Sequence, residues 1–145
     1  GAVHVLYSGD DDHLYSFVAA QPTVVTSLCD GQPAGCFVVT DAAPLLAIGS
    51  DDTPVALYHG SDGALYSAQL VGGLWTAVVA VSAGETTRLP AAIVTGSNGS
   101  IVDVVYVRDA DNLPRHASLG AGGWSAPITV ADTPLTAAPA LTVAP

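Results

Sequence analysis

The sequence contains no lysine and no methionine, and few of its residues carry a charge. Only 11% of the 145 residues are charged, whereas 50% are hydrophobic. Intrinsic disorder requires few apolar and many charged residues, so this composition excludes a disordered acidic tail and predicts a folded domain. Without a methionine the chain has no start residue of its own, and we expect it to be a processed product or a fragment.

Positive charge and long apolar runs are also scarce. Three arginines against 13 acidic residues give a formal net charge of -10. Such a charge repels phosphate backbones and anionic lipid surfaces. Gly, Pro, Asp or Ser interrupts every apolar stretch before the roughly 18 residues that a membrane span requires. The sequence therefore predicts no nucleic-acid partner and no membrane span.

Only two cysteines are present, and they lie close together. The turn-forming pairs Asp-Gly and Gln-Pro separate Cys29 from Cys36, which favours a hairpin disulfide. Two reduced core cysteines or half of a metal site are the alternatives, although neither a CxxC spacing nor a nearby histidine supports zinc. A disulfide in an acidic, lysine-free chain indicates a secreted or cell-surface protein.

Three kinds of landmark recur along the chain at a fixed distance. Tyrosines at the head of similar segments are 51 and 48 residues apart, and tryptophans that follow Gly-Gly pairs are 49 apart. A proline also opens an apolar run in each copy. These landmarks are Tyr7, Tyr58 and Tyr106; Trp75 and Trp124; and Pro44, Pro90 and Pro139. A period of about 48 residues in three copies indicates a repeat protein.

Within one period the sequence predicts four short strands and no helix. In the middle copy these strands are residues 44–48, 55–59, 64–71 and 75–81, separated by turns rich in Gly, Asp and Ser. No stretch sustains the 3.6-residue period of a helix. Four antiparallel strands every 40 to 50 residues are typical of a β-propeller blade. We therefore predict an all-β, three-bladed segment over residues 1–145, with repeats at 1–43, 44–89 and 90–138.

The two ends of the chain fall inside a repeat. The first copy begins at its second strand, and residues 139–145 are predicted to be a first strand that completes the blade begun at residue 1. Three blades are too few to close a ring. Either two chains associate to form six blades, or the chain is a segment of a larger propeller. A β-sandwich of about ten to twelve strands fits the composition but does not explain the period.

Residues 55–66, the Gly-Gly-Leu-Trp run ending at Trp75 and residues 89–94 resemble the repeat of bacterial propeller lectins of the tectonin and Photorhabdus-lectin type. That repeat includes a hairpin similar to an Asp box, and the similarity extends over nearly the whole chain. The first copy lacks Gly-Gly-x-Trp, and the third has Pro114 where Tyr15 and Tyr66 stand. The resemblance implies a secreted carbohydrate-binding module that binds glycans through repeated sites.

Catalytic residue patterns are scarce. The one glutamate, Glu85, lies in a turn and is expected to be solvated. Of the three arginines, Arg108 and Arg115 belong to one hairpin, so a triad around a substrate carboxylate is not expected. No Ser/His/Asp constellation is visible. We predict no enzymatic activity; the alternatives are an assembly module without a small ligand and, more remotely, a glycosidase-related propeller.

The repeated aromatic residues are the best candidates for ligand binding. Sugars stack their C–H faces on aromatic rings while neighbouring polar groups fix the hydroxyls. The candidates are Trp75, Trp124, Tyr15, Tyr66, His59 and His116. The alternative is that the rings fill space between blades, which we prefer for the strand tyrosines. Asp109 and Asp111 could bind calcium, but the turn-forming role of aspartate is the preferred interpretation there and at Asp62, and no other cofactor is expected.

Overall fold

A computed structural model describes residues 3–9, 14–18, 26–27, 43–82, 84–87 and 90–142. The predicted disulfide between Cys29 and Cys36 lies outside these residues, as does Arg88. The described residues form strands and turns, which confirms the predicted all-β class. They include no helix long and apolar enough to cross a membrane.

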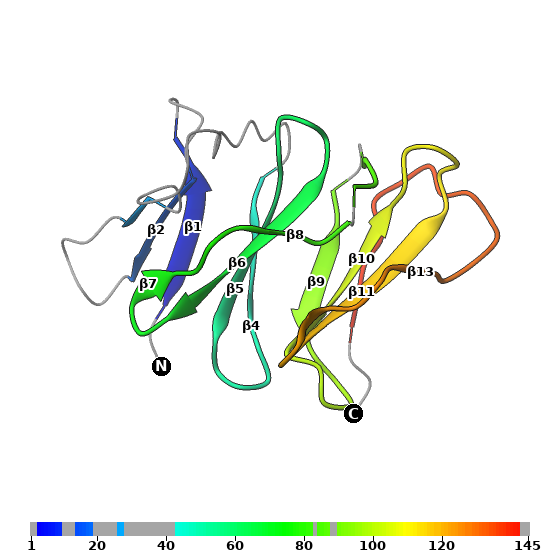
Figure 1. The fold of residues 1–145 in the computed structure, drawn as a ribbon. Helices are drawn as coiled ribbons and strands as arrows, with labels where there is room; N and C mark the ends of the chain where they lie inside the picture. Colours follow the sequence, from blue (N-terminus) through cyan, green and yellow to red (C-terminus); the bar gives the residue numbers. More distant parts are fainter. Residues whose placement is uncertain are drawn as a thin grey trace.

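The described strands form three antiparallel sheets that follow one another along the chain (Figure 1). Sheet 1 contains β1 (His4–Ser8), β2 (Leu14–Val18) and β3 (Thr26–Ser27). Sheet 2 contains β4 (Leu45–Ile48), β5 (Pro54–His59), β6 (Leu65–Val71), β7 (Leu74–Trp75) and β8 (Val79–Ala80). Sheet 3 contains β9 (Ala92–Thr95), β10 (Val102–Val107), β11 (Pro114–Gly120), β12 (Gly123–Trp124) and β13 (Ile128–Thr129). A β-sandwich would have two sheets.

The fourth strand predicted at 75–81 is divided into two short pieces, β7 and β8. The register along β6 explains the break, because Leu70 pairs with Trp75 whereas Tyr66 pairs with Ala80. One extra residue therefore lies on the outer strand, which is a β-bulge. The same shift separates β12 from β13 in sheet 3.

A side-chain hydroxyl bridges the bulge in both sheets. The Gln69 N–H donates to Thr76 Oγ1 at 3.0 Å, and the Thr76 N–H donates back to the Gln69 carbonyl at 2.8 Å. Ser125 and Ser118 repeat these two contacts at 3.0 and 2.9 Å. The expectation of one continuous strand was wrong because the hydroxyl replaces a backbone acceptor at this point of the ladder.

Successive sheets pack face to face through apolar side chains. Leu14 of sheet 1 contacts Ala56, Tyr58 and Ala68 of sheet 2. The other face of sheet 2 packs on sheet 3 through a larger cluster that contains Leu57, Leu65, Val81, Ala91, Val104, Tyr106 and Ala117. Because neighbouring residues of a strand point to opposite faces, β5 is buried along almost its whole length between its two neighbours.

The central hairpins of the three sheets align by their cross-strand pairs. Tyr7 pairs with Tyr15, Tyr58 with Tyr66, and Tyr106 with Arg115. Arg115, and not Pro114, therefore occupies the place of the second tyrosine, because the hairpin of sheet 3 is one residue longer than that of sheet 2. The prediction that Pro114 stands in the place of Tyr15 and Tyr66 was therefore wrong by one residue.

The C-terminal segment repeats the path of an earlier connection. The Leu135 N–H donates to the Asn112 carbonyl at 2.8 Å, as the Thr87 N–H does to the Gly63 carbonyl at 2.9 Å. Asn112 (φ 58°) and Gly63 (φ 78°) share the left-handed conformation that this turn requires. Residues 139–142, predicted to be a strand, form no β-bridge with any described residue, although they lie beside sheet 3 (Figure 1).

Candidate functional site

A hollow of about 960 Å³ lies on the face of sheet 3 that is turned away from sheet 2. Its floor comes from β10 and β11, and its walls come from the turn at 97–100, the Gly-rich turn before Trp124 and the end of the C-terminal segment. Asp103, His116, Ser118 and Trp124 line it together with Leu141. Two of the predicted ligand-binding residues, His116 and Trp124, thus meet in one place.

The carboxylate of Asp103 is the centre of the polar groups in the hollow. Its Oδ1 accepts a hydrogen bond from Ser118 Oγ at 2.6 Å and lies 3.1 Å from His116 Nε2. Its Oδ2 accepts from Ser100 Oγ at 2.9 Å and from the Ser97 N–H at 3.1 Å. Only 13% of the Asp103 side chain is exposed, so four neighbours fix its orientation.

These contacts keep Asp103 ionised. Burial raises the pKa of its carboxyl, but the hydrogen bonds from Ser118, Ser100 and the backbone of Ser97, with a further one from His116, lower it more. The pKa of Asp103 is therefore below its usual value. The hollow presents a negatively charged acceptor at neutral pH.

The Asp103, His116 and Ser118 group differs from a catalytic triad. In a triad the imidazole contacts the carboxylate through one nitrogen and the nucleophilic hydroxyl through the other. Here the same nitrogen, His116 Nε2, lies 3.1 Å from Asp103 Oδ1 and 3.4 Å from Ser118 Oγ. The serine hydroxyl donates to the carboxylate, and the imidazole does not stand between the two groups as it does in a triad.

Sequence reasoning missed this group because its members meet only through strand register. Asp103 pairs directly with Ser118 across β10 and β11, and His116 lies two residues earlier on the same face. The alternation of His116 and Ser118 within one predicted strand was the available signal. The position of Asp103 opposite them depends on the length of the hairpin.

The same positions in sheet 2 serve a different purpose. By register Val55 corresponds to Asp103 and Ser67 to His116. Val55 is fully buried, and Ser67 accepts a hydrogen bond of 2.8 Å from the Nε1 of Trp124 in sheet 3. In sheet 2 these positions pack against the neighbouring sheet, whereas in sheet 3 they carry an ionised carboxylate and an imidazole.

Both predicted tryptophans connect one sheet to the previous one. Trp75 Nε1 donates to Ser16 Oγ at 2.7 Å, just as Trp124 donates to Ser67. Each indole also packs against an apolar cluster between the sheets. Trp124 in addition borders the hollow, whereas Trp75 is not among the residues that line it.

The predicted tyrosines and His59 lie away from the hollow. Tyr15 stacks on Tyr7 with ring centroids 5.6 Å apart, and Tyr66 stacks on Tyr58 at 6.1 Å. His59 is half-buried; its Nε2 has no hydrogen-bond partner among the described residues, and burial lowers its pKa.

Asp62 closes its hairpin as predicted. Its Oδ1 accepts the Ala64 N–H at 3.0 Å, and its Oδ2 accepts the Tyr66 hydroxyl at 2.7 Å. The first contact is the local aspartate turn, in which the carboxylate binds the backbone two residues on. The turn-forming interpretation is confirmed at this position.

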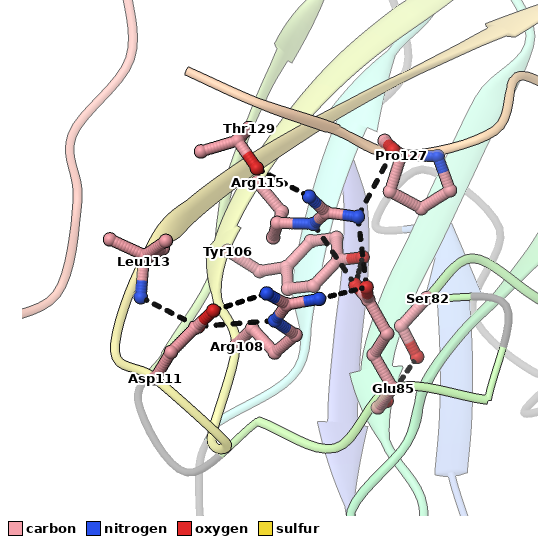
Figure 2. Close-up of polar contacts among 9 residues, drawn as sticks. All are labelled: Ser82, Glu85, Tyr106, Arg108, Asp111, Leu113, Arg115, Pro127 and Thr129. Atoms are coloured by element: carbon pink, nitrogen blue, oxygen red, sulfur yellow. Dashed lines mark hydrogen bonds and ion pairs between the residues drawn. The ribbon is translucent and has the colours of Figure 1, made fainter. Parts of the chain in front are cut away.

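Glu85 is the centre of an ion-pair cluster between sheets 2 and 3 (Figure 2). Tyr106 donates its hydroxyl to Glu85 Oε2 at 2.6 Å, and Arg115 Nη2 and Arg108 Nη1 contact Oε1 at 2.9 and 3.2 Å. The side chain is only 19% exposed, so the expectation of a solvated glutamate was wrong. Two arginines do converge, but on a carboxylate of the protein itself.

Of the two calcium candidates, Asp111 has its carboxylate bound by an arginine. Arg108 binds both carboxylate oxygens of Asp111, and Asp111 Oδ1 also accepts the Leu113 N–H at 3.1 Å. The hydrogen bonds from Arg108 lower the pKa of Asp111 to about 2. The Asp109 N–H donates to the Thr86 carbonyl at 2.8 Å. In the described part of the chain no three His, Cys, Asp or Glu side chains are grouped to hold a metal ion.

Comparison with known proteins adds no family to this description. A scan against protein-family models finds none that matches the chain, and a search of curated proteins finds no similar sequence.

Proposed function

We propose that the chain is a non-enzymatic, carbohydrate-binding module of the β-propeller type and that the hollow on sheet 3 is its ligand site. One observation carries the proposal: Asp103 and His116 stand where sheet 2 has the buried Val55 and the inter-sheet acceptor Ser67. Packing between sheets does not require an ionised carboxylate, and burying one has a cost. The substitution is explained if this face binds a polar ligand.

The chemistry of the hollow suits a neutral sugar. A sugar hydroxyl can donate to the carboxylate of Asp103, while His116 and Ser118 supply further hydrogen-bonding groups, and Trp124 at the border offers an aromatic edge. Acidic sugars are disfavoured, because Asp103 is negative and the chain has a formal charge of -10. Arg108 and Arg115 already bind Glu85, so they do not offset this repulsion.

The propeller part of the proposal is supported by the repetition of geometry. Sheets 2 and 3 share a four-strand order, a bulge at the same place and a hydroxyl that bridges it. The segments that follow these sheets donate hydrogen bonds to equivalent carbonyls, from Thr87 to Gly63 and from Leu135 to Asn112. Three consecutive blades of one ring account for these equivalences, and a secreted location remains part of the proposal.

The proposal is tested with a panel of immobilised neutral mono- and disaccharides and matched sialylated glycans. We expect binding to at least one neutral sugar, weaker binding to its sialylated form and a loss of about tenfold or more in Asp103→Asn, because a hydrogen bond to a charged group is lost. Asp62→Asn is the matched control, since Asp62 is not among the residues that line the hollow. Absence of binding across the panel, or unchanged affinity in Asp103→Asn, would refute the proposal.

A further inference from the structure

The backbone around Glu85 is held by contacts that do not involve its carboxylate (Figure 2). The Glu85 N–H donates to the Ser82 carbonyl at 2.9 Å, and Ser82 Oγ donates to the Glu85 carbonyl at 2.7 Å. The next residue, Thr86, forms a β-bridge with Ala64, and its carbonyl accepts the Asp109 N–H at 2.8 Å. The connection between sheets 2 and 3 is therefore fixed at this point without the Glu85 side chain.

The two arginines that contact this carboxylate are also oriented by other groups. Arg108 binds both carboxylate oxygens of Asp111. Arg115 donates from Nη1 to Thr129 Oγ1 at 2.5 Å and from Nη2 to the Pro127 carbonyl at 3.2 Å. Both guanidinium groups are thus positioned in advance. A binding group that is already ordered loses less entropy when its partner arrives, so this arrangement favours binding.

The donors around Glu85 have the geometry that suits a carboxylate. Arg115 contacts both of its oxygens, with Nη2 2.9 Å from Oε1 and Nε 3.3 Å from Oε2. The Tyr106 hydroxyl donates to Oε2 and Arg108 Nη1 donates to Oε1, so each oxygen receives two hydrogen bonds. A contact of one guanidinium with both oxygens is a common way in which proteins recognise a carboxylate.

The packing of one sheet on the next does not require these charges. Tyr106 pairs with Arg115 in sheet 3, whereas the same positions of sheet 2 hold an uncharged, stacked pair, Tyr58 and Tyr66. Sheet 2 packs on sheet 1 with these rings in place. A buried guanidinium needs a charged partner, and an apolar or aromatic filling does not. Packing between sheets alone therefore does not explain the charged group.

We propose that Tyr106, Arg108 and Arg115 form a binding site for a free carboxylate and that the Glu85 side chain is its intramolecular occupant. Because the backbone of Glu85 is held separately, the side chain can leave by rotation while the connection stays in place. A group on the same chain has an effective concentration of about 1 mM or more, so it excludes carboxylates that bind weakly. Glu85 is thus an autoinhibitory contact, and the ligand is a small carboxylate anion.

This carboxylate site is separate from the hollow on sheet 3. Tyr106 belongs to the apolar cluster between sheets 2 and 3, whereas the hollow lies on the other face of sheet 3. Neither Arg108 nor Arg115 is among the residues that line the hollow. The inference therefore does not rest on the proposed function, and a failure of glycan binding would leave it unchanged.

The test removes the occupant and supplies the same group in solution. Glu85→Ala deletes the heavy atoms of one acetate, and Glu85→Gly deletes those of one propionate. Thermal unfolding is followed by circular dichroism in about 100 mM sodium acetate, propionate or chloride at equal ionic strength. Acetate should raise the midpoint of Glu85→Ala by about 3 °C or more relative to chloride, because it binds the folded chain. Propionate should have the larger effect on Glu85→Gly.

Two controls separate binding at this site from a general effect of the salt. In wild type the site is occupied by Glu85, so acetate and chloride should give midpoints within about 1 °C of each other. Asp62→Ala is the matched variant, since it also removes a carboxylate that accepts a tyrosine hydroxyl, here that of Tyr66. The other printed partner of Asp62 is a backbone N–H, that of Ala64. Acetate should not stabilise this variant more than it does wild type.

Equal midpoints of Glu85→Ala in acetate and chloride would overturn the inference. So would a stabilisation by acetate that is as large in wild type or Asp62→Ala, or one that does not differ between acetate and propionate in either Glu85 variant, because the anion would then bind elsewhere. If Glu85→Ala is unfolded in chloride, its circular dichroism spectrum should return to that of wild type in acetate. A spectrum that stays unfolded in acetate would also overturn the inference.

Discussion

The contact between sheets 1 and 2 and the contact between sheets 2 and 3 have the same frame but different contents. In both, a tryptophan of the later sheet donates to a serine of the earlier one. The first contact adds the stacked pair of Tyr58 and Tyr66, whereas the second adds the cluster around Glu85. The repeated packing of sheets therefore depends on the shared tryptophan and apolar contacts. It accommodates either the stacked tyrosines or the ion-pair cluster.

A single exchange accounts for the difference. Arg115 stands opposite Tyr106, where Tyr66 stands opposite Tyr58. A guanidinium that is only 14% exposed requires an acceptor, because burying an unpaired charge has a large cost. Glu85, in the connection between the two sheets, supplies that acceptor. Tyr66 needs no such partner, since its hydroxyl is satisfied by Asp62 of its own hairpin.

Removal of the tryptophan that each contact contains is expected to have the largest effect on stability. Trp75→Ala and Trp124→Ala should each lower the free energy of unfolding by about 3 kcal/mol, through lost apolar contact and a cavity. Urea unfolding followed by far-ultraviolet circular dichroism measures this loss. The two values should be similar. A cost below about 1 kcal/mol for either variant would show that the tryptophan does not stabilise that contact between sheets.

Removal of the charge at Glu85 should affect only one contact. We expect Glu85→Gln to lower the free energy of unfolding by about 2 kcal/mol, because Arg108 and Arg115 lose their common acceptor. Trp124 alone, in a Trp75→Phe background, reports on sheets 2 and 3 by fluorescence, and Trp75 alone, in Trp124→Phe, reports on sheets 1 and 2. The urea midpoint should shift more for the Trp124 reporter.

Equal shifts of the two reporters would show that Glu85 stabilises the chain as a whole. Asp62→Asn is the matched variant for the other contact. Asp62 is exposed at the surface of its hairpin, so its replacement should cost clearly less than that of Glu85.

The parts of the fold that could be predicted from sequence are those that depend on local signals. The strands, the turns and the hairpin closed by Asp62 follow from residue type over a few positions. The bulge left only a weak sign, a hydroxyl after each tryptophan. The extra residue in the hairpin before Leu113 moved Arg115 into the tyrosine position and could not be recognised without the cross-strand register.

The candidate site depended on register for the same reason. His116 and Trp124 were candidates from their residue types, but Asp103 was not, since its position opposite Ser118 follows from the pairing of β10 with β11. The environment of Glu85 depends on residues 21 to 30 positions later in the chain. A turn motif gives no information about contacts at that distance.

Loss of the serine acceptors is a smaller test of the shared frame. Ser16→Ala and Ser67→Ala each leave a tryptophan Nε1 without its partner while the ring stays in place. We expect a cost of about 1 kcal/mol for each, which is the usual net value of one hydrogen bond. Urea unfolding followed by circular dichroism measures both. If the two costs differ by more than about 1 kcal/mol, the tryptophan–serine hydrogen bond does not contribute equally to the two contacts.

The smallest expected effect is a difference in pH dependence between the two contacts. Burial raises the pKa of Glu85, but the hydrogen bonds from Tyr106, Arg115 and Arg108 bring it below its usual 4.5. The unfolded chain therefore takes up this proton first as the pH falls, so the stabilisation by Glu85 is complete above about pH 4.5 and is lost as the pH falls through the lowered value.

The measurement is the difference in free energy of unfolding between wild type and Glu85→Gln from pH 7 to pH 3. It should be constant down to about pH 5 and then shrink, because the neutral glutamine no longer differs in charge from a protonated glutamate. For Asp62 the hydrogen bond from Tyr66 is the main cause of a pKa below its usual 3.8, so the corresponding difference for Asp62→Asn should shrink only at lower pH. Coincident curves would mean that neither carboxylate reports on its own contact.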